Sequence, residues 1–197
     1  MKYPKIILIR HGETEWNQEG RFQGHLDSPL TSKGEQQARD NGQKIKKILD
    51  SLGDIELFSS PLGRAKSTAL IIANEIEFSP DKIIFDERIK EFNYGILEGK
   101  TKEYCKQNHS QTIEEREANK WFYQVENGDS YELVAKRVDS WLDSLDNSKT
   151  IIAVTHEMIN RALRKIYRGI SIDKALTLRQ PNNVVLVLEN GEEKILT

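Results

Sequence analysis

Short apolar runs alternate with longer amphipathic stretches along most of this chain. Brief β-branched runs bounded by polar or turn residues are typical of buried strands, and they lie at residues 5–9, 54–59, 83–85, 150–154 and 184–188. Apolar residues at helical spacing predict helices at about 33–52, 62–76, 131–145 and 158–167. Ser32 with Glu35 forms a capping-box pattern at the start of the first helix, and Gly53 is placed to end it.

The order of these elements predicts the class of fold. Strands that alternate with helices favour a three-layer α/β/α architecture with a mostly parallel central sheet. No repeat, low-complexity stretch or Pro/Gly/Ser linker divides the sequence, so we expect a single domain over residues 1–197. Residues 100–128 are more polar and less regular, and the part at about 100–127 is expected to form a lid-like insertion.

Cationic and titratable side chains follow three of the predicted strands. Arg10 and His11 end the first, His156 follows the run that stops at residue 154, and Arg64 comes soon after residue 59. Ligands of parallel sheets bind outside the carboxyl ends of the strands, so these four side chains are expected to converge there. Such a pocket suits a small oxyanion, because arginine forks bind phosphate oxygens in pairs. From these residues alone, surface salt bridges and structural histidines are an equally weighted alternative.

Composition and charge narrow the possible partners. The 197 residues are 37% hydrophobic and 30% charged, with a formal net charge of −2 and one cysteine, Cys105. Without a bulk basic field, neither nucleic acid nor an anionic membrane is an expected partner. A lone cysteine excludes an internal disulfide, and the apolar runs are too short for a secretory signal or a membrane span. We therefore expect a cytoplasmic protein, whose oligomeric state the sequence leaves open.

A longer motif makes the interpretation specific. Residues 10–17 read R-H-G-E-T-E-W-N, which fits the pattern R-H-G-x-T-x-x-N and resembles the histidine phosphatase superfamily, in its phosphoglycerate mutase-like branch. The similarity continues at residues 21–31, 59–65, 91–99, 128–130, 154–156 and 160–161. It covers most of the chain except residues 100–127. An R-H-G alone would be a weak signal, whereas a second Arg, a second His and a Glu in the right order make a strong one.

The resemblance implies a role for each of eight residues. His11 is the expected nucleophile, whose neutral imidazole forms a phosphohistidine while a nearby backbone carbonyl holds its other nitrogen. Glu91 is the expected general acid and then general base. The remaining implied residues are Arg10, Arg64 and His156, which clamp the phosphoryl oxygens, and Asn17, Gln23 and Gly24, which bind substrate. Positioned cations can do the work of a metal, so neither a metal ion nor another cofactor is expected.

Several of these positions also have a plain structural interpretation. Asn17, Gln23 and Gly24 fit ordinary loop and turn chemistry, and Glu91 stands in a charged stretch where a solvated carboxylate is common. Glu98 is expected to be a structural hydrogen-bonding partner. Across residues 100–127, Lys102, Tyr104, Lys106, Arg116 and Lys120 are candidate substrate contacts, with a solvated charged face as the simpler interpretation for most of them.

The sequence departs from the family at one position beside the expected site. The family commonly has His-Gly at the second histidine, and here the pair is His156-Glu157. Glu157 could repel the substrate, or supply the proton, or point away into the first turn of the next helix, where the helix dipole favours an acid. The last interpretation is preferred from the sequence.

Three functions remain open from the sequence. The first is a metal-independent phosphomonoesterase that acts through phosphohistidine on a small phosphorylated metabolite. The second is a phosphoglycerate mutase, although mutases of this family are typically longer than this compact chain. The third is a non-catalytic module that binds a phosphorylated ligand. Phosphosugars, phosphoglycerates, nucleotide-derived phosphates and α-ribazole phosphate all remain possible substrates.

Overall fold

The structure is a computed structural model that describes residues 2–49 and 54–196. Its strands are β1 (Ile6–Arg10), β2 (Ile55–Ser59), β3 (Ile84–Phe85), β4 (Thr150–Thr155), β5 (Val185–Glu189) and β6 (Glu192–Leu196). Its α-helices are α1 (Glu15–Gln18), α2 (Ser32–Lys46), α3 (Gly63–Glu75), α4 (Lys102–Asn108), α5 (Ser110–Ala118), α6 (Tyr131–Asp143), α7 (Glu157–Arg168) and α8 (Ile172–Thr177). Short 3₁₀ turns cover Pro80–Lys82, Glu87–Ile89 and Gly95–Leu97.

In the described residues the strands form one six-stranded sheet in the order β3-β2-β4-β1-β5-β6. The pairs β3/β2, β2/β4 and β4/β1 are parallel, whereas β5 pairs antiparallel with both β1 and β6. The parallel half is linked by helical crossovers, as parallel pairing requires. This confirms the expected α/β architecture with a mostly parallel sheet.

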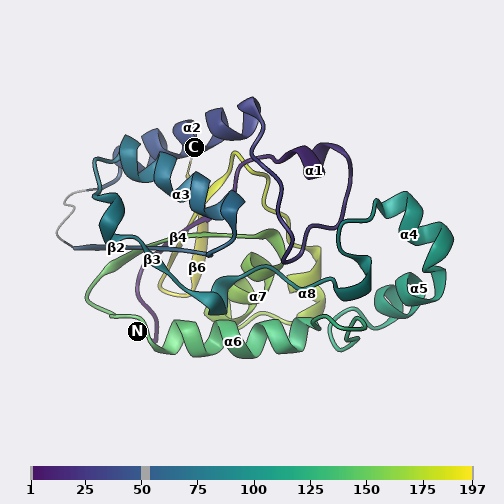
Figure 1. Cartoon of the computed structure of the whole chain (residues 1–197). Coiled ribbons are helices and arrows are strands. Elements are labelled where there is room, and N and C mark those ends of the chain that lie inside the picture. The colour runs from purple at the N-terminus through teal and green to yellow at the C-terminus, as the bar shows by residue number, and fades with distance from the viewer. Residues whose placement is uncertain (1, 50–53, 197) are drawn as a thin grey trace.

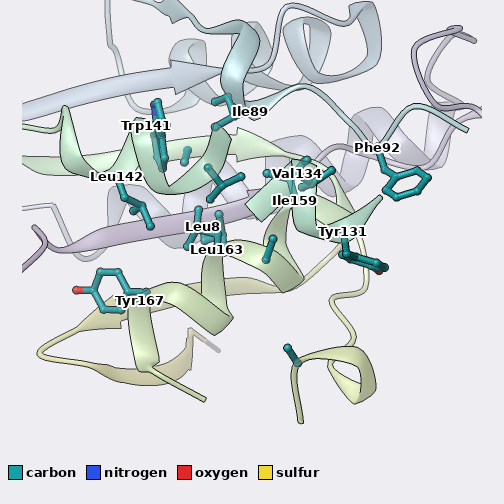
Figure 2. Packing of buried hydrophobic residues seen from close by; sticks show 14 of the residues in the cluster. Leu8, Ile89, Phe92, Tyr131, Val134, Trp141, Leu142, Ile159, Leu163 and Tyr167 are labelled. Carbon is teal, nitrogen blue, oxygen red and sulfur yellow. The ribbon is translucent and has the colours of Figure 1, made fainter. Parts of the chain in front are cut away.

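The sheet is covered on both faces because its central strands are apolar on both sides. Ile6 and Leu8 of β1 belong to a core cluster shared with α6 and α7, and Ile7 and Ile9 belong to a second cluster shared with α2 and α3. Successive strand residues point to opposite faces, so a continuous apolar run needs a helical layer on each side. Figure 1 shows α2 and α3 together on one side of the sheet and α6 on the other. Figure 2 shows the cluster around Leu8, Trp141 and Leu163.

The predicted elements are present, with one boundary wrong. The expected helix over 33–52 ends at Lys46. Residues 50–52 of the predicted helix lie outside the described residues, and so does Gly53, the residue expected to end it. Ile48 and Leu49 continue the apolar spacing beyond the end of the helix, with Ile48 in a turn, and both still pack against the second core cluster. Apolar residues at helical spacing can thus pack against the core without being part of the helix, which is why the predicted boundary was wrong.

The segment expected to be irregular is helical in part. Residues 102–118 form α4 and α5, joined at His109, with Thr101 capping α4 through its side chain. These short helices expose most of their residues, so they lack the apolar stripe that would have predicted them. Figure 1 shows them projecting together to one side of the sheet.

The double-layered core predicts a graded loss of stability at Ile72. This α3 residue is fully buried, whereas Leu70 on the same helix is exposed. We expect Ile72→Val to lower the free energy of unfolding by about 1 kcal/mol and Ile72→Ala by about 2–5 kcal/mol, measured by urea denaturation. Leu70→Ala, the matched control, should change it by less than about 0.5 kcal/mol. Equal losses at both positions would contradict this account of the core.

Candidate functional site

The carboxyl ends of β1, β4 and β2 meet at one edge of the sheet. Arg10 stands opposite Thr155 in the parallel register, and the His11 backbone N–H continues the pairing by donating to the Thr155 carbonyl at 3.0 Å. On the other side of β4, the Ser60 N–H donates to the Val154 carbonyl at 3.0 Å. In Figure 1, β2 runs from the grey trace toward the side where α4 and α5 lie. The register therefore brings the two expected histidines together.

His11 lies directly after β1 at this edge of the sheet, and a hydrogen bond fixes its tautomer. Its Nδ1 donates to the carbonyl of Gly12 at 2.7 Å, which leaves Nε2 as the nitrogen with a lone pair. Burial, followed by the charges of Arg64 and Arg10, holds the pKa of His11 well below its usual value. Gly12 is required here because a Cβ would collide with the backbone of Gly34 in α2. The site therefore presents a neutral imidazole nitrogen to an electrophile.

His156 lies beside His11 but deeper in the protein. The two ring centroids are 5.1 Å apart, and His156 is 0% exposed. Its Nε2 is 2.8 Å from Ser60 Oγ, while its buried Nδ1 has no hydrogen-bond partner among the described residues. Burial and the nearby Arg64 also hold the pKa of His156 well below its usual value. His156 does not line the cavity described below, unlike the other seven expected site residues.

Two arginines flank His11 and are held in different ways. Arg64, in the first turn of α3, donates from Nη1 to the Leu26 carbonyl at 2.8 Å and from Nη2 to the Gly24 carbonyl at 2.7 Å. Arg10 donates from Nη1 to Glu157 and to the Gln180 carbonyl. In the described part of the chain, the Nε of each arginine is buried without a partner. Because buried donors are nearly always satisfied, both Nε groups indicate a missing acceptor.

Glu91 lines the same cavity as His11 and is buried, at 8% exposed. Its Oε1 accepts a hydrogen bond from the Phe92 N–H at 2.8 Å. Burial raises the pKa of Glu91 above its usual value, against the lowering effects of that hydrogen bond and of Arg64 and Arg10. A carboxyl group of this kind keeps a proton at higher pH than a solvated glutamate does.

The three predicted substrate-binding residues also serve the loop. Asn17 lines the cavity, and its Oδ1 accepts from the Thr14 N–H in a capping box that starts α1. Gln23 accepts from Ser28 Oγ at 3.4 Å. Gly24 has φ +56°, and a Cβ there would collide with the Glu98 carboxylate. Glu98 accepts from the N–H groups of His25 and Tyr94, so its expected structural role is consistent with its contacts.

These side chains open onto a cavity of about 370 Å³ whose lining is strongly basic. Apart from the residues above, its cationic lining consists of Arg21, Lys102, Lys106, Arg116, Lys120, Arg161 and Arg179. Among the candidate contacts of the 100–127 segment, Tyr104 is exposed and is not part of the lining. Arg116 is not a solvated surface residue, because it is 5% exposed and its Nε is buried without a partner among the described residues.

Glu157 occupies the first turn of α7, as the sequence predicted. Its side chain, however, does not point away from the site. Its Oε2 accepts from Arg10 Nη1 at 2.7 Å, and the residue lines the cavity. Its Oε1 accepts from Arg161 Nη2 at 2.6 Å and from Arg179 Nη1 at 3.3 Å. The attraction of neighbouring guanidinium groups therefore directs this carboxylate, rather than the helix dipole alone.

Three residues that position the site were not found from the sequence. Arg137 of α6 donates to the carbonyls of Arg88, Lys90 and Glu91, and so fixes the segment that carries the Glu91 carboxyl. Gln180 donates to the Leu8 carbonyl at 2.9 Å, and Asn182 donates to the His11 carbonyl at 2.6 Å.

Of these three residues, only Arg137 stands in a sequence pattern that could have drawn attention to it. Arg137 stands three residues after Val134 and four before Trp141, both fully buried, so it interrupts an apolar helix face. Gln180 and Asn182 lie in a polar loop that carries no such pattern.

The described residues show neither a metal-binding cluster nor a membrane-spanning helix. No group of three or more His, Cys, Asp or Glu side chains in the described ranges could hold a metal ion. None of the helices described here combines the length and apolarity needed to cross a bilayer. Metal independence and the compartment both stay predictions.

Comparison with known proteins places this geometry in a family. The profile of the Histidine phosphatase superfamily (branch 1) matches residues 6–196. "Probable phosphoglycerate mutase GpmB" of Shigella boydii serotype 18 is 36% identical over 190 residues, covering 90% of this chain and 81% of its own length. The solved structure of Bacillus stearothermophilus YhfR is 28% identical with a TM-score of 0.77, covering 98% of this chain and 95% of its own.

A more distant structure shares the fold. The alpha-ribazole phosphatase from Shigella flexneri is 22% identical with a TM-score of 0.78, covering 97% of this chain and 94% of its own. Fold, motif and sequence similarity over nearly the whole chain agree, and the chain is an enzyme that belongs to the histidine phosphatase superfamily, branch 1.

Proposed function

We propose that this protein is a metal-independent phosphomonoesterase that acts on a small phosphorylated metabolite through a phosphohistidine on His11. The observation that carries the proposal is the state of His11: buried, neutral, with Nδ1 bonded to the Gly12 carbonyl and two arginines beside it. Such a nitrogen is a competent nucleophile, and the arginines supply the charge stabilisation that a metal provides in other phosphoryl-transfer sites.

The reaction proceeds in two displacements. The lone pair of His11 Nε2 attacks phosphorus while the bond from phosphorus to the leaving oxygen breaks, and protonated Glu91 gives its proton to that oxygen. Water then attacks the phosphohistidine, Glu91 takes a proton from the water, and the bond from Nε2 to phosphorus breaks to release inorganic phosphate. The raised pKa of Glu91 supports the first half of this cycle, because the group must begin protonated.

The phosphoryl oxygens have three candidate donors. Arg10 and Arg64 each carry a buried Nε without a partner among the described residues, and the Nδ1 of His156 is in the same condition. We assign these donors to the non-bridging oxygens, where negative charge is spread in the transition state. Asn17, Gln23 and Gly24 would then line the entrance, with the amide of Asn17 as a further donor.

The substrate is inferred to carry a second anionic group besides the phosphate. Arg116 is almost fully buried in the cavity wall, with its guanidinium over the rings of Phe92 and Tyr94 and a single bond to Glu117. Lys120 binds the same Glu117 carboxylate, and the buried Nε of Arg116 has no partner among the described residues. Such a buried cation is costly unless a further anion meets it. Residues 100–127 would thus act as a lid-like insertion of a single domain and set the choice of substrate.

Phosphoglycerate mutase activity is the second candidate, and the name of the 36% identical relative favours it. A mutase returns the phosphoryl group to substrate and must keep water from the phosphohistidine. The cavity of about 370 Å³ is large enough to admit water, which needs only about 10–15 Å³ of such volume, and this is compatible with hydrolysis.

The nucleophile can be tested by trapping the intermediate. Rapid quenching with a ³²P-labelled phosphomonoester should give an acid-labile, base-stable label on His11, because phosphohistidine has that stability. His11→Ala should abolish the label and lower kcat by about 10³-fold or more. His109→Ala is the matched control and should retain both, since His109 does not line the cavity.

The same preparation separates the three functions. Absence of label with every phosphomonoester of a broad panel would favour a binding module. Isomerisation of 3-phosphoglycerate that outpaces phosphate release, with or without 2,3-bisphosphoglycerate, would favour the mutase.

Glu91→Gln should reveal the proton donor through the choice of leaving group. Loss of general acid catalysis should lower kcat/KM, which reports the first displacement, by about 10²–10⁴-fold for an alkyl phosphate, and far less for p-nitrophenyl phosphate, whose leaving oxygen needs no proton. For the wild-type protein, kcat/KM should fall as pH rises through the raised pKa of Glu91 and as pH falls through the lowered pKa of His11. An equal loss on both substrates would argue against Glu91 as the acid.

Arg116→Lys should identify the second anion subsite. The loss of a charge-assisted hydrogen bond should raise KM for 3-phosphoglycerate by about 10-fold or more, with little change for p-nitrophenyl phosphate, which lacks a second anion. Unchanged KM values for both substrates in steady-state assays would exclude this subsite.

A further inference from the structure

We propose that Glu157 is a positioning residue for Arg10, so that the phosphate clamp depends on a carboxylate at the position where the family commonly has glycine. This rests on the proposed function. Glu157 joins three guanidinium groups at the start of α7: its Oε2 binds Arg10, and its Oε1 binds Arg161 and Arg179. The Glu157 side chain is 17% exposed, so its ion pairs with Arg10 and Arg161 are partly shielded from water, whereas Arg179 is exposed.

The hydrogens of Arg10 show what Glu157 controls. Nη1 uses its donors on Glu157 Oε2 at 2.7 Å and on the Gln180 carbonyl at 3.2 Å. A guanidinium is planar, so two acceptors on one nitrogen fix the direction of the whole fork. Nε is then the buried donor left without a partner among the described residues. Glu157 therefore binds Nη1, and the edge of the guanidinium that carries Nε is left for the phosphoryl group.

Glu157 is itself fixed from the side opposite Arg10. Arg161 is almost fully buried, and it donates from Nε to the Leu178 carbonyl at 2.7 Å and from Nη1 to Tyr131 Oη at 2.9 Å. Its Nη2 is thus directed at Glu157 Oε1 at 2.6 Å. The loop after α8 and the α6 residue Tyr131 therefore hold Arg161 in place. Arg161 in turn holds the Glu157 carboxylate that binds Arg10.

The same contacts weigh against the two other roles considered for Glu157. As a proton donor it would need an oxygen directed at the leaving group, whereas both of its oxygens accept hydrogen bonds from arginines. As a repulsive charge it would weaken the binding of every anion, but its charge is shared among three cations. Each alternative predicts a different behaviour of the Glu157→Gln variant.

The test compares Glu157→Gln with Glu193→Gln. Glu193 of β6 is a matched control because it is 13% exposed and binds two arginines of the same helix, Arg164 and Arg168, away from the cavity lining. Both substitutions leave buried guanidinium groups with a weaker partner, so both should lower the thermal midpoint. Any effect on catalysis that follows from lost stability alone should appear in both variants.

Positioning of Arg10 predicts a specific pattern for Glu157→Gln. We expect kcat/KM to fall by about 10- to 100-fold, equally for p-nitrophenyl phosphate and an alkyl phosphate, because the clamp serves both. The inhibition constant of orthovanadate, which mimics five-coordinate phosphorus, should rise by a similar factor. Glu193→Gln should keep wild-type values of both quantities.

Other outcomes overturn the proposal. A loss confined to the alkyl phosphate would make Glu157 a proton donor, and tighter orthovanadate binding with unchanged turnover would make it a repulsive charge. Equal losses in both variants would reduce it to a structural residue. If the wild-type protein hydrolyses no phosphomonoester, the proposed function fails, whereas calorimetric binding of orthovanadate to the two variants still tests the positioning of Arg10.

Discussion

The parallel pairing of β1 with β4 is the constraint on which the site depends. It aligns Arg10 with Thr155, so the next residue of each strand is a histidine, and the two rings lie 5.1 Å apart. Both imidazoles are buried at the end of a hydrophobic sheet, and both stand near guanidinium groups that disfavour a further positive charge. A shift of this register by one residue would turn the alternating side chains of β1 to the opposite faces of the sheet.

A neutral histidine carries no negative charge that could stabilise a neighbouring arginine, so other groups must stabilise Arg10 and Arg64. Arg64 is surrounded by backbone carbonyls of the loop at residues 24–26 and by Asp27, so a folded loop offsets its desolvation. Arg10 uses a carboxylate instead, and that carboxylate is tied to further arginines. The two clamp residues thus differ in what holds them, and a change at Glu157 acts on one of them while sparing the other.

Much of this arrangement could be predicted from the sequence, for identifiable reasons. Long amphipathic periods located α3, α6 and α7, and the motif around residues 10–17 located His11. Short exposed elements such as α4 and α5 were missed because they bury few side chains. The β5/β6 hairpin carried a usable signal in Asn190-Gly191, whose φ values of 56° and 78° suit its turn. The direction of the Glu157 side chain could not be predicted, since it depends on Arg161 and Arg179 meeting it in space.

A crystal structure of the protein with orthovanadate would show whether His11 is the nucleophile of this site. We expect vanadium bonded to His11 Nε2, with the Nε groups of Arg10 and Arg64 on its equatorial oxygens and the Glu91 carboxyl beside an axial oxygen. Vanadate bound elsewhere in the basic cavity, with His11 Nε2 free, would contradict the assignment of His11 as nucleophile.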